Sequence, residues 1–133
     1  MKRLLFLLNK KGFFALLLAL FLGSGTAYAY SDFSAVSPSG HTLYYRITDY
    51  INNYVELTYP GTLNEPWGGY AQPTGNVTFP STVTNNGTTY TVKGIGQYAF
   101  FRCAGMTGSL TIPNTVTSIG QFAFQVCSGL NGT

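Results

Sequence analysis

The second half of the sequence contains an internal repeat. Residues 94–106 align with residues 118–130 at an offset of 24, with identical Ile, Gly, Gln, Ala, Phe, Cys and Gly positions. Seven identities in thirteen positions at one fixed spacing indicate a structural repeat. Each copy carries one short apolar stripe that is too small to fold alone, so the copies must stack to bury it. We therefore expect Phe100 and Phe124 to lie one above the other.

A second part of the repeat recurs at a larger offset. Residues 74–84 align with residues 107–117, which lie 33 positions later. The additional residues, 85–93, contain Asn86-Gly87, a pair typical of the tight turn of a β-hairpin. The first repeat therefore carries an inserted hairpin. The predicted units are residues 74–106, residues 107–130 and a third repeat that is cut off at 131–133.

Within each unit the pattern predicts a short strand followed by a compact turn region. Leu110-Thr111-Ile112 alternates apolar and polar residues, as in a half-buried strand. Pro113 ends this strand because proline has no N–H to donate. Residues 120–127 are expected to form one or two helical turns. The structural positions of the two repeats, which we expect in the core, are Ile95, Phe100, Cys103, Ile119, Phe124 and Cys127.

The segment between residues 30 and 73 differs from the repeats. Residues 42–48 and 54–59 are rich in β-branched and aromatic side chains and are separated by a polar stretch. Such a pattern predicts an antiparallel β-hairpin. Because the terminal core of a solenoid needs cover, we interpret residues 30–73 as an N-terminal β cap.

Residues 1–29 have the pattern of a secretory signal peptide. Four of the seven basic residues precede or flank the start of an apolar run at 13–22, and Ala27-Tyr28-Ala29 supplies a cleavage pattern. The run is shorter than the roughly 20 residues that a membrane-spanning helix needs. We expect cleavage after Ala29, which leaves no membrane span and a protein that is secreted or held at the cell surface.

The charge and the titratable residues exclude several classes of function. The full chain has a net charge of +3, but residues 30–133 contain three basic and four acidic side chains, a net charge of −1. No basic surface for nucleic acid remains. The single histidine, His41, has no nucleophile or carboxylate partner in the sequence pattern. Asp49, Glu56 and Glu65 are interpreted as isolated charges and not as a glycosidase pair, so we predict no enzymatic activity.

Cys103 and Cys127 occupy the same position in adjacent repeats. Neighbouring strands lie about 4.8 Å apart, a separation at which a disulfide can form in an oxidising compartment. The alternative, which we favour, is a pair of buried free thiols that pack as small hydrophobic groups. Two cysteines and one distant histidine match no tetrahedral zinc spacing. We therefore expect no metal and no other cofactor.

The repeated string resembles the BspA-like class of bacterial leucine-rich repeats. The pattern is Ile-Gly-x-x-Ala-Phe-x-x-Cys-x-Gly-Leu followed by Leu-Thr-Ile-Pro-x-x-Val-Thr-x-Ile-Gly, over roughly residues 74–133. The resemblance implies a right-handed, β-rich leucine-rich repeat solenoid with a parallel sheet on one side, and we expect the short helical turns on its convex side. It also implies export to the bacterial surface and adhesion to host matrix proteins or to other cells.

The preferred functional hypothesis is binding of a protein partner on the host matrix or on another cell. Thr78 and Thr111 are expected to face outward from the strands in rows, with Asn114 close by. Such a surface has low charge and binds through shape and many weak hydrogen bonds. Thr78, Thr111 and Asn114 are therefore candidate binding residues.

Two alternatives remain open. Trp67 and Tyr70 could form a platform on which a sugar ring stacks, as in a carbohydrate-binding module, or they could pack the core of the cap. The chain could also be a truncated fragment without independent function, because at least three repeats are ordinarily needed for stability. In that case Phe124 and Leu130 would be partly uncovered.

Overall fold

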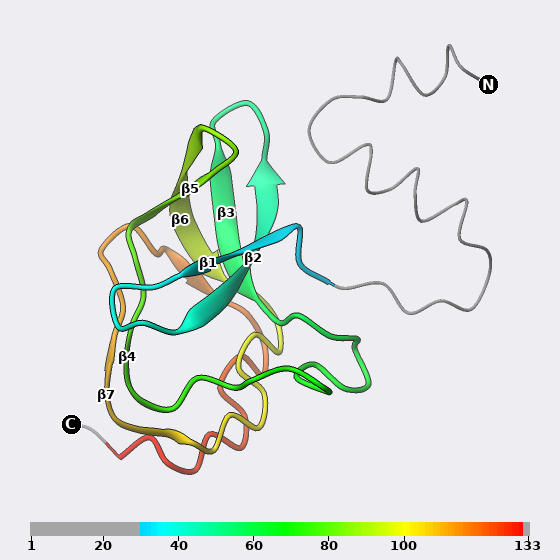
Figure 1. The fold of residues 1–133 in the computed structure, drawn as a ribbon, viewed down its shortest axis with the longest axis vertical. Coiled ribbons are helices and arrows are strands. Elements are labelled where there is room, and N and C mark those ends of the chain that lie inside the picture. The colour runs from blue at the N-terminus through cyan, green and yellow to red at the C-terminus, as the bar shows by residue number, and fades with distance from the viewer. Residues whose placement is uncertain (1–29, 132–133) are drawn as a thin grey trace.

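Figure 1 shows a computed structural model of the chain, which describes residues 30–131. The predicted signal peptide, with its cleavage site after Ala29, lies outside the described residues. The described residues contain no helix, and the strands among their turns and loops are β1 (Phe33–Val36), β2 (Thr42–Asp49), β3 (Tyr54–Thr58), β4 (Gly75–Thr78), β5 (Thr82–Asn85), β6 (Thr88–Ile95), β7 (Met106–Thr111) and β8 (Ser118–Ile119).

The larger sheet joins the N-terminal segment to the repeats. Its strand order is β1-β2-β3-β6-β5, and β8 also pairs with β6. β2 and β3 pair antiparallel, whereas β3 and β6 run parallel. Leu57 accepts a backbone hydrogen bond from Gly96, and Ile95 accepts one from Gly120 in the same way, each at 2.7 Å. β3 therefore occupies the place that a preceding coil of the repeat would take.

The two offsets seen in the sequence are the registers of strand pairing. Ile95 pairs with Ile119 in the parallel contact between β6 and β8, which is the smaller of the two offsets. Thr78 pairs with Thr111 in the second sheet, in which β4 and β7 run parallel at the larger offset. The structure thus confirms that equivalent positions of the two repeats stack.

The predicted hairpin insertion is also confirmed. β5 and β6 pair antiparallel, and Asn85 faces Thr88 across a two-residue turn. Asn86 has a φ of 49° and Gly87 a φ of 79°. Positive φ at both central residues defines a type I′ turn, whose twist matches that of the flanking strands. The additional residues therefore lie in the hairpin of β5 and β6. The two repeats still pair after this hairpin, at Ile95 and Ile119.

The predicted helical turns are wrong. Residues 120–127 form successive β-turns with hydrogen bonds from Ala123 N to Gly120 O and from Cys127 N to Phe124 O. In the first coil (residues 94–106), alternate backbone N–H groups donate to carbonyls of the second coil (residues 118–130), as from Phe100 N to Ala123 O at 2.8 Å. These donors of the first coil are used between coils, and the N–H groups of residues 123, 125 and 127 bond three residues back, in place of the four-residue spacing of an α-helix.

The turns require residues with positive φ at regular positions. Tyr98 and Arg102 have φ values of 57° and 61°, and their counterparts Phe122 and Val126 have values of 60° and 61°. Each of these residues stands third in its turn, as the positive-φ residue of a type II turn does. The second coil therefore repeats the backbone path of the first residue by residue.

Aromatic rings form the centre of the core. The ring of Phe100, which is 1% exposed, stacks on Phe79 with the centroids 4.9 Å apart and on Phe124 at 5.5 Å. The planes of Phe100 and Phe124 differ by 7°. The expectation that these two rings lie one above the other is confirmed. Ala123 and Cys127 face inward, and Phe124 is partly buried against the same core.

Candidate functional site

The β4–β7 sheet brings together Thr78 and Thr111, two of the predicted binding residues. They are paired neighbours, with Thr111 exposed and Thr78 partly buried. Asn76 and Ser109 form a parallel polar pair, since the Asn76 side-chain oxygen accepts a hydrogen bond from the Ser109 N–H at 2.9 Å. Asn114 is exposed in the loop that follows β7. We call the polar surface of Asn76, Thr78, Ser109 and Thr111 the β4–β7 face.

The outer edge of β4 is covered by a turn of the N-terminal segment. The Thr78 N–H donates to Ser39 Oγ at 3.0 Å, and His41 Nε2 lies 2.7 Å from the carbonyl oxygen of Thr74. Because a carbonyl only accepts, Nε2 carries the hydrogen, and His41 Nδ1 accepts from Ser39 Oγ at 2.9 Å. His41 thus holds a turn on the edge of a strand.

Sequence reasoning missed this role of His41, because it gave the histidine no partner. The signal lay in the cluster Ser37-Pro38-Ser39-Gly40-His41, in which two hydroxyls lie two and four positions from an imidazole. Ser37 Oγ accepts from the His41 N–H at 3.2 Å and contacts Ser39 Oγ at 3.0 Å. Short polar side chains of this kind form local hydrogen bonds with nearby backbone and stabilise turns.

The second coil exposes apolar side chains along the direction of stacking. The prediction that Ile119 lies in the core is wrong: it continues the row of Leu57 and Ile95 but is 55% exposed, because within residues 30–131 no further coil covers it. Phe122 stacks on Tyr98 with the centroids 5.2 Å apart and is 39% exposed. Within residues 30–131, β7 pairs only with β4 and β8 only with β6. Within residues 30–131 the second coil therefore exposes the same rows of side chains and strand edges by which the first coil contacts the second.

Trp67 lies in the core. Of the two roles left open for it by the sequence, this position fits packing and not a sugar-stacking platform. Its ring is 5% exposed, and its Nε1–H donates to the carbonyl of Ala99 at 3.0 Å. Trp67 and Tyr70 each contact Tyr44 edge-on, at 5.7 and 5.8 Å between centroids. Burial, and to a smaller degree the neighbouring Tyr70, raises the pKa of Tyr44. Tyr70 is 44% exposed and covers Tyr44 from outside.

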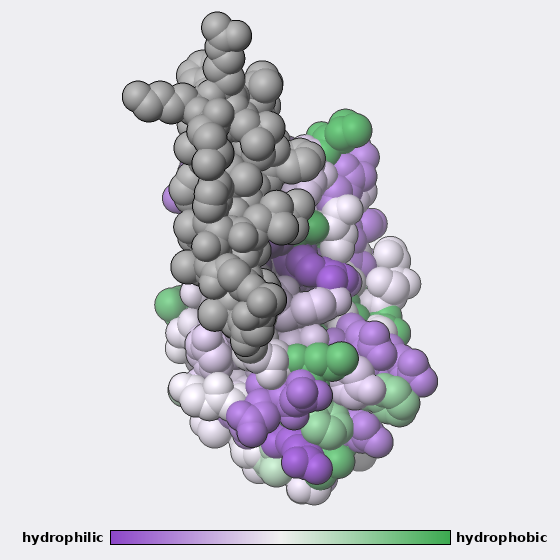
Figure 2. Space-filling view, turned by 90° about the vertical axis from the view of Figure 1, so that its right-hand side faces the viewer, coloured by the Kyte–Doolittle hydropathy of each residue, from purple (hydrophilic) through white to green (hydrophobic). Residues whose placement is uncertain are grey.

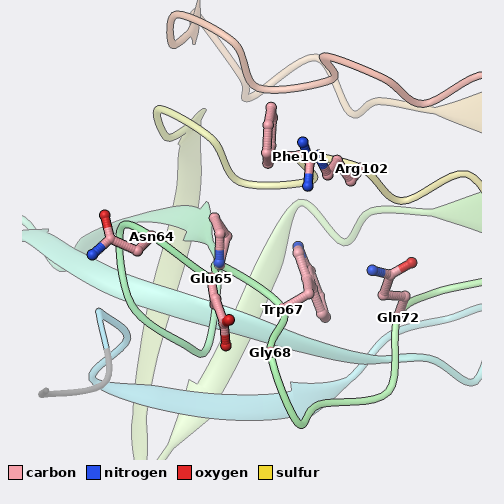
Figure 3. Close-up of a pocket in the computed structure, with 8 residues that line it drawn as sticks. Asn64, Glu65, Trp67, Gly68, Gln72, Phe101 and Arg102 are labelled. Atoms are coloured by element: carbon pink, nitrogen blue, oxygen red, sulfur yellow. The ribbon is translucent and has the colours of Figure 1, made fainter.

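A pocket of about 220 Å³ lies between the loop of residues 61–72 and the first coil (Figure 3). The loop contributes most of the lining, and the coil contributes two adjacent side chains. The lining residues include Glu65, Trp67, Gln72, Phe101 and Arg102, with Asn64 at the rim. On the side of the molecule from which this loop projects, the visible described residues mix hydrophilic and hydrophobic groups without one continuous apolar patch (Figure 2).

Both cysteines are buried and carry free thiols. Burial raises the pKa of Cys103, with a smaller contribution from Cys127. The Cys127 thiol donates to the carbonyl oxygen of Phe100 at 2.9 Å, and burial also raises the pKa of Cys127. A protonated, enclosed thiol is a poor nucleophile and a poor metal ligand, so the pair serves as core packing.

The carboxylates are dispersed over the described residues. Glu56 forms an ion pair with Arg46 at 2.6 Å. Asp49 accepts hydrogen bonds from the backbone N–H groups of Ile51 and Asn52, and the bonds from Asn52 lower its pKa most. Within residues 30–131, no three His, Cys, Asp or Glu side chains are grouped so that they could hold a metal ion. None of these residues forms a helix long and apolar enough to cross a membrane.

Comparison with known proteins identifies the repeat class. The stacked coils, with parallel strands paired at both offsets of the sequence repeat, define a leucine-rich repeat fold. Residues 75–132 match the family described as BspA type leucine rich repeat region. These residues are therefore a BspA-type leucine-rich repeat region, as the sequence pattern indicated. No curated protein sequence gives a significant match.

Two solved structures resemble the chain in fold and sequence. A leucine-rich repeat protein from Bacteroides ovatus ATCC 8483 is 31% identical over 76% of this chain, with a TM-score of 0.57. A leucine-rich repeat protein from Bacteroides capillosus ATCC 29799 is 31% identical over 68% of this chain, with a TM-score of 0.52. The chain spans 22% of the first structure and 58% of the second.

Proposed function

We propose that this chain belongs to an exported, non-enzymatic binding protein of the bacterial surface. Its partner is a protein of the host matrix or of another cell, and the contact surface is the β4–β7 face together with Asn114, which is exposed in the loop after β7. The observation that carries the proposal is the pairing of Thr78 with Thr111 between β4 and β7, beside the hydrogen bond that the Ser109 N–H donates to the Asn76 side chain. Stacked repeats of this kind commonly present extended surfaces to protein partners.

The chemistry of the face favours a protein partner. Its side chains are hydroxyls and amides, which both donate and accept hydrogen bonds. Charged residues are depleted from the core of protein interfaces, and the four residues of the β4–β7 face carry no charge. The pattern of residues 1–29 supports export, with cleavage after Ala29. In this proposal the coil is right-handed and residues 30–73 act as its N-terminal cap.

The experiment is an adhesion measurement with matched variants. Purified chain is tested against a panel of immobilised extracellular matrix proteins and against intact bacterial cells. Thr111→Ala combined with Asn114→Ala should weaken binding by about tenfold or more, since each interface hydrogen bond contributes roughly 1 kcal/mol. Thr84→Ala, an exposed threonine on the inserted β5–β6 hairpin, is the control and should bind as the parent does.

Equal binding by the double variant and the parent would contradict this assignment of the contact surface. The double variant must keep the melting temperature of the parent, because both side chains are exposed. Loss of binding in the Thr84→Ala control would move the contact surface to the hairpin and would equally contradict the proposal.

A further inference from the structure

The pocket beside the loop of residues 61–72 lies at the part of the first coil whose residues differ from their counterparts in the second coil. Phe101 and Arg102 stand at the positions that Gln125 and Val126 hold in the second coil. Both coils make the same turns with the same positive φ, so the backbone does not require an aromatic or a cationic residue there. The two departures line the pocket.

The walls of the pocket are held in place by contacts that need no ligand. Trp67 is fixed by its hydrogen bond to Ala99 and by stacking on Phe100 at 6.1 Å. Within the loop, the N–H groups of Thr62 and Gly68 both donate to the carbonyl of Glu65, at 3.2 and 3.1 Å. Pre-formed walls reduce the entropy lost when a ligand binds.

The cationic side of the pocket is likewise oriented in advance. The guanidinium carbon of Arg102 lies 5.1 Å from the centre of the Phe101 ring. A guanidinium over an aromatic ring is attracted to the negative face of that ring. Arg102 is exposed, so its N–H groups remain available to a ligand.

A carboxylate and a guanidinium line the same pocket without forming an ion pair. Within residues 30–131 the ion pair is that of Arg46 with Glu56, and Figure 3 shows Glu65 and Arg102 apart, Glu65 on the loop and Arg102 on the first coil. Glu65 only accepts hydrogen bonds and Arg102 only donates them, while the Gln72 amide does both. An anion would be repelled by Glu65 and a cation by Arg102, whereas a hydroxyl-rich neutral ligand satisfies both groups.

We propose that this pocket binds one ring of a neutral glycan. Its hydroxyls bridge Glu65 and Arg102, Gln72 adds a further hydrogen bond, and the apolar face of the ring lies against Phe101 and the part of Trp67 that lines the pocket. The volume of about 220 Å³ suits a single ring, because pockets for drug-sized ligands begin near 300 Å³. The site goes beyond protein binding by the β4–β7 face and differs from a Trp67–Tyr70 platform, since Trp67 is nearly enclosed.

The test is a glycan array followed by calorimetric titration of the purified full chain. The array carries neutral oligosaccharides of glucose, galactose, mannose and N-acetylglucosamine beside sialylated and sulfated ones. We expect a neutral glycan to bind and Glu65→Gln and Arg102→Gln each to weaken binding about tenfold or more, because each removes a charge-assisted hydrogen bond. Phe101→Gln should weaken it by removing the apolar wall.

The design separates loss of the site from loss of the fold. Phe101→Gln installs the residue of the second coil, Arg102→Gln keeps an unbranched side chain at the same positive φ, and Glu65 and Arg102 are exposed, so the variants should melt as the parent does. Thr111→Ala, on the β4–β7 face, is the control and should retain full glycan binding even where it loses a protein partner. Absence of any neutral glycan ligand would overturn the proposal. So would a bound glycan that is indifferent to Glu65 and Arg102, or an acidic glycan whose binding survives Glu65→Gln.

Discussion

Phe100 and Phe124 stack face to face with their centroids 5.5 Å apart, although they belong to different copies of the repeat. This contact joins the two coils through their equivalent positions, and Phe79 extends it on the other side of Phe100. Phe100 has rings on both faces, whereas Phe124 is only partly buried. The two phenylalanines therefore occupy the same position in the repeat and differ in how much the fold depends on them.

Removal of the Phe100 ring should cost the most stability. A fully buried phenylalanine replaced by alanine loses about 3–5 kcal/mol, because both the burial and the packing around it are lost. Phe124→Ala should cost less, since part of its ring already faces solvent. Urea denaturation of the two variants, read by circular dichroism, measures this order. Equal losses would contradict the stacked arrangement.

Substitution of Val126 by asparagine should stabilise the protein. Val126 has a φ of 61° and is 56% exposed, so a β-branched residue occupies a backbone conformation that it rarely adopts. Asparagine tolerates this conformation, and we expect a gain of about 1 kcal/mol. Val36→Asn is the control, because Val36 is exposed in β1 with an ordinary strand backbone, where the change should be slightly destabilising. Thermal unfolding of both variants checks the sign.

Loss of the His41 imidazole should release the turn that covers β4. In His41→Ala, Thr74 O and Ser39 Oγ lose a partner, and a lost hydrogen bond of this kind costs about 1–2 kcal/mol. Hydrogen exchange locates the effect: the Thr78 amide, which donates to Ser39, should exchange faster. The Phe79 amide, which donates to Thr111 O at 3.0 Å, should keep its protection. Unchanged exchange at Thr78 would exclude the proposed coupling.

Stability should fall at alkaline pH. Burial raises the pKa of the Cys103 thiol and of the Tyr45 hydroxyl, so both stay protonated in the folded protein after the unfolded chain has begun to ionise. The unfolded groups titrate near about 8.5 and 10, so stability is complete below that range. Above it, each group lowers the free energy of unfolding by about 1.4 kcal/mol per pH unit until the folded group itself ionises. Urea denaturation at neutral and alkaline pH measures the slope, and Cys103→Ala should remove the thiol's share.

The sequence was sufficient to predict the repeat register, the inserted hairpin and the stacking of Phe100 on Phe124. These features follow from identities at fixed spacing and from the Asn-Gly turn, both of which are visible in the order of residues along the chain. The prediction of helical turns at 120–127 was wrong because the spacing of Ala123, Phe124 and Cys127 fits one face of a helix as well as it fits the observed turns. Only the hydrogen bonds between coils, which no single segment contains, distinguish the two conformations.

The candidate sites were less predictable than the core. The pairing of Thr78 with Thr111 follows from the repeat, but the pocket depends on how the loop of residues 61–72 crosses the first coil. Glu65 and Arg102 are 37 positions apart, and no periodicity relates them. A signal was present all the same, because Phe101 and Arg102 interrupt the match between the two repeats.

The long strand β6 has consequences for how the protein unfolds. Along its length it is bonded to β3, to β5 and to β8, so the N-terminal hairpin, the inserted hairpin and the last coil all share one backbone element. A solenoid whose units touch only their neighbours can fray from one end, one rung at a time. Here unfolding from one end would stop at β6. Disruption of β6 would unfold the N-terminal hairpin, the inserted hairpin and the last coil together.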